Sequence, residues 1–207
     1  RGTGAVVTLA SVRANQVLVK EKAAALYSFS KGSSTQSYPG SLMGTISLLR
    51  QTYLDAQWYK SNPKAEGVNL TLKAWNDQQN LPQVFDPSQG GDLWNVMRAD
   101  RIGDEFGVQY IIKASGKEYQ RISDVAATKA PLIVSLNYPA AQDVEDPNAA
   151  RYVSLADMKH WELAPTNPAA IEKAGIPFVL TMSDVRDGRT FMSNLRKAME
   201  YGLSETA

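Results

Sequence analysis

The chain has 207 residues and a net charge of +1 with acids and bases interspersed, which excludes a basic surface for nucleic acid or an anionic membrane. It has no cysteine, which excludes disulfides, thiol catalysis and cysteine-ligated zinc, and its single histidine, His160, excludes a histidine-based metal cluster. No apolar run approaches the roughly 20 residues that span a bilayer. Because the sequence begins at Arg1 rather than at methionine, we expect a processed or excised piece.

The first 80 residues differ in pattern from the rest of the chain. A strand is expected over 5–10, followed by a short β-excursion and a polar loop over 16–40. Residues 41–60 predict a strong helix, because apolar side chains recur there every three or four positions on one face. These side chains are Leu42, Ile46, Leu49 and Tyr53.

After this region the chain repeats a strand-then-helix unit. Four apolar runs predict strands, at 81–85, 108–112, 131–136 and 176–181. Helical patterns lie between them, most clearly over 92–106. Since these strands are apolar almost throughout, we expect burial on both faces, which is typical of a parallel sheet covered by helices. The four strands should therefore be parallel neighbours with the helices packed outside.

The units follow one another every 25 residues or so, roughly the spacing of a (β/α) barrel or of a doubly wound sheet. No sequence repeat, low-complexity tract or linker divides the chain, so we expect a single domain over 1–207. A full eight-fold barrel takes about 250 residues. We therefore expect a partial barrel that lacks its first strand or strands and its C-terminal end. Its open sheet edges imply either a larger parent barrel or self-association.

Polar residues follow the carboxyl ends of the predicted strands, which is where parallel α/β proteins carry out chemistry. They are Asp86, Ser115, Tyr138 and Asp184. We expect their side chains to point into a shared mouth at one end of the sheet. Simpler interpretations stay open beside this one: Asp184 caps a helix or makes a turn, Asp86 makes a turn, and His160 is a structural or surface histidine.

Four stretches of the sequence carry a resemblance to a known family. Residues 81–119, "LPQVFDPSQGGDLWNVMRADRIGDEFGVQYIIKASGKEY", resemble the central segment of amidohydrolases related to imidazolonepropionase. Residues 160–184, "HWELAPTNPAAIEKAGIPFVLTMSD", and 195–205, "LRKAMEYGLSE", resemble the closing units of that family. Residues 29–59, "FSKGSSTQSYPGSLMGTISLLRQTYLDAQWY", resemble the first barrel of long exported proteins with two amidohydrolase-like halves. The helix residues that match are Asp92, Leu93, Arg98, Asp104, Glu105, Phe106 and Gly107.

The resemblance implies a (β/α)8 TIM barrel of the metal-dependent hydrolase type, with parallel strands and outer helices. Active members hold one or two divalent metals such as zinc, through a His-x-His on the first strand, a mid-barrel Lys or Glu, two later histidines and a final aspartate. The first strand is absent here, and the two later histidines fall on Asp86 and on Ser115 or Ala114. Asp184 keeps the family residue type, and Glu118 matches the Glu of the family's Glu-His-Gly-x-Glu pattern.

On this resemblance Asp184 is the expected catalytic residue, and Asp86, Ser115, Glu118 and Tyr138 are the expected substrate-binding residues. A catalytic zinc site takes about three strong protein ligands. The aligned positions supply only two carboxylates and a serine, so the metal site is degenerate, no metal ligand is assigned, and no bound cofactor is expected in this segment. A lone carboxylate is too weak a base to make hydroxide at neutral pH.

The expected function is that of a segment of an amidohydrolase-family protein, which hydrolyses C–N bonds in cyclic amides or amino acid derivatives, with this segment not competent alone. The alternative is a non-enzymatic scaffold or partner half-barrel that supports an active amidohydrolase domain elsewhere in the parent chain. Expected partners are the remainder of the parent chain or another copy, without nucleic acid and without a membrane span. The resemblance also implies a periplasmic or exported location.

Overall fold

The computed structural model describes residues 2–11, 13–63, 65, 67–87 and 92–207. The chain divides into two compact units, each described below on its own. The first unit comprises Arg1–Gln89 and Arg98–Ile112, and the second comprises Gly90–Met97 and Lys113–Ala207. Within the described residues, none of the helices combines the length and apolar character that a bilayer span requires.

Within the described residues, six strands form the sheet, in the order β1-β2-β3-β4-β5-β6. They are β1 (Thr3–Val7), β2 (Leu18–Ser28), β3 (Gln83–Asp86), β4 (Ile111–Lys113), β5 (Leu132–Ser135) and β6 (Phe178–Thr181). β1 pairs antiparallel with β2, whereas β2 with β3, β3 with β4, and β5 with β6 are parallel pairs. The prediction of four neighbouring strands after residue 80 is confirmed, and the sheet is mostly parallel, but the strand predicted over 108–112 is present only as Ile111–Lys113.

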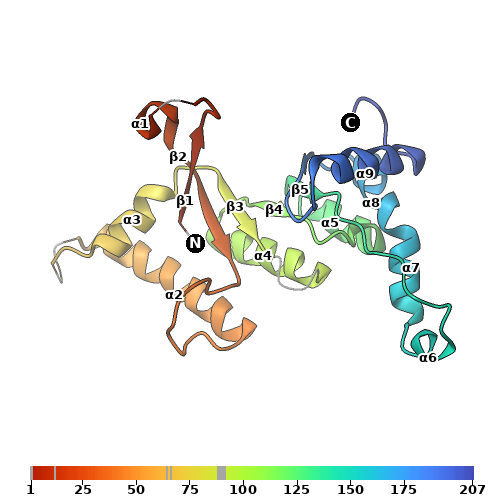
Figure 1. Ribbon diagram of the computed structural model, residues 1–207. Coiled ribbons are helices and arrows are strands. Elements are labelled where there is room, and N and C mark those ends of the chain that lie inside the picture. Colours follow the sequence, from red (N-terminus) through yellow and green to blue (C-terminus); the bar gives the residue numbers. More distant parts are fainter. Residues whose placement is uncertain (1, 12, 64, 66, 88–91) are drawn as a thin grey trace. The chain divides into compact units, whose positions relative to one another are not determined.

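The helices separate the strands along the chain, as Figure 1 shows by colour. The α-helices are α1 (Ala14–Val17), α2 (Leu42–Ser61), α3 (Leu70–Gln78), α4 (Leu93–Phe106), α5 (Ile122–Ala127), α6 (Pro147–Ala150), α7 (Leu155–Leu163), α8 (Asn167–Lys173) and α9 (Gly188–Glu200). Short 3-10 helices are η1 (Glu118–Arg121) and η2 (Ala164–Thr166). Neighbouring strands in the sheet follow one another in the sequence, which is the order of a (β/α) barrel, whereas a doubly wound sheet reverses its order at a switch point. The fold is therefore mixed α/β and consistent with a partial barrel.

The predicted burial of the strands holds only in part. β3 and β5 alternate between buried and half-buried positions. β6, by contrast, has no fully buried residue, and Val179 is 59% exposed. β6 is the last strand in the sheet order, and among the described strands its neighbour is β5. The burial on both faces that the apolar run 176–181 predicted is therefore wrong for this strand.

An aromatic core fills the first unit. The hydroxyls of Tyr53 and Tyr110 share a hydrogen bond of 2.5 Å, and the Tyr27 hydroxyl donates to Gln83 Oε1 at 2.6 Å. Burial raises the pKa of the Tyr53 and Tyr110 hydroxyls above the ordinary tyrosine value, so both stay neutral. The rings pack against Trp75, Phe85 and Phe106. The predicted helix over 41–60 is confirmed as α2, although Tyr53 is the only buried member of its predicted apolar face.

A buried carboxylate organises the second unit. Glu118 is 0% exposed, and its Oε1 accepts hydrogen bonds from the Ser115 backbone N–H at 2.6 Å and the Ser115 hydroxyl at 2.7 Å. Its Oε2 accepts from Gly116 N at 3.1 Å and from Asn167 Nδ2 at 2.8 Å. Asn167 Oδ1 in turn accepts from Tyr119 N at 2.8 Å. The carboxylate thereby holds the loop after β4, the start of η1 and the start of α8 in one arrangement.

The first testable prediction concerns Asp100 on α4. Burial, and then the like charge of Asp104, raise the pKa of the Asp100 carboxyl to about 6. The unfolded chain has an aspartate pKa of about 3.9, so between about pH 4 and pH 6 the folded state binds more protons, and the free energy of unfolding falls as pH rises. Asp100→Asn removes this effect and should stabilise the protein at pH 7 by about 1–2 kcal/mol.

Urea unfolding at pH 4, 5, 6 and 7 measures the effect for the natural chain and for Asp100→Asn. Asp104→Asn is the matched control, because it removes only the smaller of the two causes and should produce a smaller gain at pH 7. A stability difference between the natural chain and Asp100→Asn that does not change from pH 4 to pH 7 contradicts the prediction.

The second prediction concerns Glu118. In Glu118→Gln a carboxylate oxygen becomes an NH2 group, which faces N–H donors instead of accepting from them. The buried donors then lose a charged acceptor, so we expect a loss of about 2–3 kcal/mol in the free energy of unfolding. Glu105→Gln is the matched control, since Glu105 makes an ion pair with Arg50 at the surface and should cost less than about 1 kcal/mol. Chemical unfolding followed by circular dichroism measures the free energy of unfolding of both variants. Equal losses would contradict the role of Glu118 as the buried acceptor that organises the second unit.

Candidate functional site

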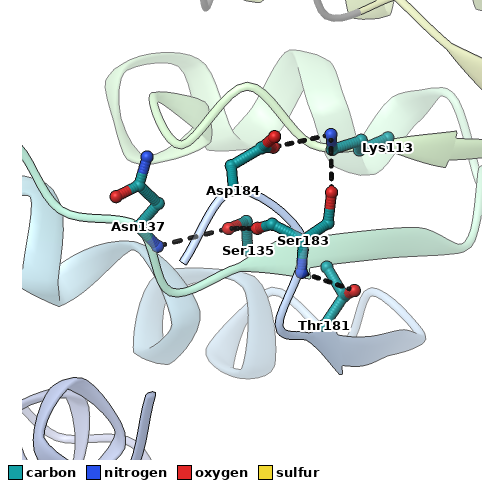
Figure 2. Close-up of polar contacts among 6 residues, drawn as sticks. All are labelled: Lys113, Ser135, Asn137, Thr181, Ser183 and Asp184. Atoms are coloured by element: carbon teal, nitrogen blue, oxygen red, sulfur yellow. Dashed lines mark hydrogen bonds and ion pairs between the residues drawn. The ribbon is translucent and has the colours of Figure 1, made fainter. Parts of the chain in front are cut away.

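An ion pair lies at the carboxyl ends of the strands in the second unit. Lys113, the last residue of β4, donates from Nζ to Asp184 Oδ2 at 2.7 Å and to Ser183 Oγ at 3.2 Å (Figure 2). The Lys113 side chain is only 13% exposed, whereas the Asp184 side chain is 56% exposed. A side chain that is largely buried thus pairs with one that is more than half exposed. Asp184 has a φ of +67°, in the left-handed region that aspartate adopts more readily than most residues.

A chain of hydrogen bonds positions the loop that carries Asp184. The Ser135 hydroxyl, at the end of β5, donates to the Ser183 carbonyl oxygen at 2.6 Å and accepts from Asn137 N at 3.2 Å. Ser183 N donates to Thr181 Oγ1 at 3.1 Å. Figure 2 shows these groups together around the turn after β6. The turn is therefore fixed to β5 by hydroxyl and backbone groups, and it presents Asp184 to Lys113.

A small cavity brings two of the predicted substrate-binding residues together. Ser115 and Tyr138 both line a space of about 30 Å³, together with His160. A cavity needs about 10–15 Å³ to hold one water, so this one has room for a water or two and for no larger ligand. The Tyr138 hydroxyl is buried and makes no hydrogen bond within the described residues. Burial raises the Tyr138 pKa above its ordinary value, so the group remains a neutral donor.

His160 lies on α7 beside this cavity. Its Nδ1 is 3.0 Å from the Tyr119 hydroxyl, and the two rings stack with centroids 6.1 Å apart. Burial, followed by the positive charge of Lys117, lowers the pKa of His160 below its ordinary value. At neutral pH the ring is therefore neutral. These contacts agree with the interpretation of His160 as a structural histidine.

The structure brings together some of the predicted site residues and leaves others apart. Ser115 and Glu118 are hydrogen-bonded to each other, and Ser115 and Tyr138 share the small cavity. Asp184 follows β6 in the same unit and pairs with Lys113. Asp86 closes β3 in the first unit, opposite Ser28 of β2, so its convergence with the other residues stays a prediction. The catalytic and substrate-binding roles stay predictions as well.

Sequence reasoning missed Lys113 and Ser183. The signal for Lys113 was present in "IIK", residues 111–113, where a lysine ends an apolar strand on the same edge that the aspartate was expected to occupy. Ser183 directly precedes Asp184, and its hydroxyl became relevant only when the turn after β6 was seen to face Lys113.

The donor set around Asp184 does not fit the divalent metal that the family resemblance implies. The carboxylate is accompanied by hydroxyl and backbone groups, and its nearest partner is an ammonium group that repels a cation. In the ranges that the structure describes, nowhere do three or more His, Cys, Asp or Glu side chains gather as a metal ion would require. Lys113 supplies the positive charge at this position.

Comparisons with known proteins give one structural relative. No protein-family model matches the chain, and no curated protein matches it either. Among solved structures, the crystal structure of an amidohydrolase from Thermotoga maritima MSB8 is similar, with a TM-score of 0.70 and 20% sequence identity. The match covers 99% of this chain and 53% of that chain, so the present chain spans about half the length of its relative. At this identity the likeness shows that the two share a fold, and that fold is found in an amidohydrolase.

Proposed function

We propose that this chain forms part of an amidohydrolase-type (β/α)8 barrel that has no hydrolytic centre of its own. The observation that carries the proposal is the ion pair between Asp184 and Lys113. The structural likeness to the Thermotoga maritima amidohydrolase supports the fold, and the quoted sequence stretches support the finer relation to imidazolonepropionases and to two-barrel exported proteins.

The chemistry of the ion pair argues against hydrolysis by this segment. Cleavage of an unactivated C–N bond needs an activated water, and a carboxylate alone does not generate hydroxide at neutral pH. Asp184 is engaged by an ammonium group at 2.7 Å, which balances its charge without supplying a Lewis acid. As an ammonium ion, Lys113 has no lone pair with which to accept a proton. The pair therefore contains no group that acidifies a water, which is what the hydrolytic step requires first.

In this proposal the segment acts as a scaffold or partner for an active half. Hydrolysis of C–N bonds in cyclic amides or amino acid derivatives then belongs to another part of the parent protein, and divalent metal belongs there too. The partner is the remainder of that protein or a second copy of this chain, in a periplasmic or exported location. Asp184 is the aspartate retained from the family. Asp86, Ser115, Glu118 and Tyr138 correspond to the substrate-binding residues around the family's active site.

The third prediction tests activity directly. The purified chain, with Zn²⁺ or Mn²⁺ added, should show no turnover of a panel of cyclic amides and dipeptides, because no group in it activates water. The Asp184→Asn variant should likewise show no turnover. Metal analysis of the purified chain should find far less than one equivalent of zinc. Metal-dependent hydrolysis that Asp184→Asn abolishes would falsify the proposal and identify a working enzyme.

The fourth prediction tests the ion pair by a double-mutant cycle. Asp184→Asn removes the counter-ion of a lysine whose side chain is only 13% exposed, and it should cost about 1–2 kcal/mol. Lys113→Met keeps the apolar stem and leaves a carboxylate that is more than half exposed, so solvent screening should limit its cost to less than about 1 kcal/mol. The double variant should resemble Lys113→Met, since the charge that needed a partner is gone. Costs that simply add in the double variant would show that the pair is not coupled.

A further inference from the structure

The hydroxyl of Tyr138 is a buried donor for which the described residues provide no acceptor. Tyr138 lies in the segment that follows β5, and its ring lines the small cavity of the second unit. Transfer of a hydroxyl out of water without a replacement hydrogen bond is costly. Native proteins leave few such groups unpaired, and ordered water is a frequent partner. The Tyr138 hydroxyl therefore calls for an acceptor other than the described groups of the chain.

The size of this cavity limits what that acceptor can be. Its volume of about 30 Å³ exceeds the roughly 10–15 Å³ that one water requires, and it is far below the roughly 300 Å³ at which small-molecule sites begin. The described residues that line it lie between Ser115 and Pro168, so the cavity is internal to the second unit and neither end of the sequence forms part of its wall. Water is therefore the class of ligand that the cavity admits.

The lining of the cavity consists largely of hydrogen-bonding side chains. They are those of Ser115, Ser135, Asn137, His160 and Asn167, beside Tyr138 itself. The remaining described positions of the lining are a glycine, an alanine and a proline. Cavities that stay dry are lined by aliphatic and aromatic groups, whereas a polar cavity of sufficient size holds a water that bonds to two to four groups. The chemistry of this lining thus matches a water.

Two serine hydroxyls in the lining keep the acceptors that such a water needs. Ser115 Oγ donates its proton to Glu118 Oε1 and accepts from one backbone N–H. Ser135 Oγ donates its proton to the Ser183 carbonyl oxygen and likewise accepts from one backbone N–H. Since a hydroxyl has one proton and two lone pairs, these bonds leave each serine oxygen with one lone pair. A water can donate to these lone pairs while it accepts from Tyr138.

We propose that the cavity binds an ordered water that accepts a hydrogen bond from the Tyr138 hydroxyl and donates to the hydroxyl oxygens of Ser115 and Ser135. Ser115 belongs to the network of the buried Glu118, and Ser135 holds the turn that carries Asp184. The water therefore joins these two networks through one molecule that has no covalent link to either. This inference concerns a fixed water of the fold and does not depend on the absence of hydrolysis at Asp184.

The fifth prediction is that Tyr138→Phe lowers the equilibrium constant for folding about fivefold, because the variant loses the hydrogen bond to the bound water. If the hydroxyl had no partner, its removal would relieve a buried, unpaired donor, and the constant would stay the same or rise. Urea unfolding measures the constant for the natural chain and the variant. Tyr152→Phe is the matched control, since it removes the same atom from a residue that is 89% exposed and should change the constant by less than about twofold.

A crystal structure of the natural chain locates the water directly. We expect a water within about 3.2 Å of the Tyr138 hydroxyl oxygen and of at least one of the two serine Oγ atoms. A cavity without a water overturns the proposal, and so does a Tyr138 hydroxyl that bonds directly to a protein group. A Tyr138→Phe variant that is as stable as the natural chain, or more stable, also overturns it.

Discussion

A carboxylate without access to water must have its acceptor positions filled by donors, and Glu118 meets this demand with four hydrogen bonds. The donors come from the loop after β4 and from the first residue of α8, so one side chain fixes where both segments run. Asn167 extends the arrangement to the backbone of η1. The loop that Glu118 holds begins directly after Lys113, so the same network borders the end of β4.

The ion pair between Lys113 and Asp184 balances a second charge in this unit. Lys113 closes an apolar strand and is largely shielded from solvent, so its charge needs a partner within the protein. Asp184 provides that partner from a turn that hydroxyl groups fasten to β5. The positive charge beside Asp184 is therefore covalently part of the chain, supplied by the last residue of β4.

Much of the strand framework could be predicted from the sequence, because apolar runs bounded by Gly, Pro and polar residues depend on local pattern alone. The predicted end of β6 and the location of Asp184 after it follow from the same pattern. The ion pair could not be predicted this way, since Lys113 and Asp184 are 71 positions apart and meet only through the sheet order. Likewise the hydrogen bonding of the buried Glu118 includes Asn167, the first residue of α8, which lies 49 positions away in the sequence. The exposure of Val179 also escaped prediction, because a hydrophobic strand does not reveal from its own composition whether it stands at the edge of a sheet.

The left-handed backbone at Asp184 changes how the identity of this residue should be interpreted in related chains. At a φ of +67° glycine, asparagine and aspartate are the residues that fit with least strain. Of these, glycine has no side chain to meet Lys113, and asparagine offers it no charge. Aspartate alone satisfies both the turn and the neighbouring ammonium group. An aspartate at this position of a related chain is therefore sufficiently explained by backbone geometry and charge balance wherever the lysine is present as well.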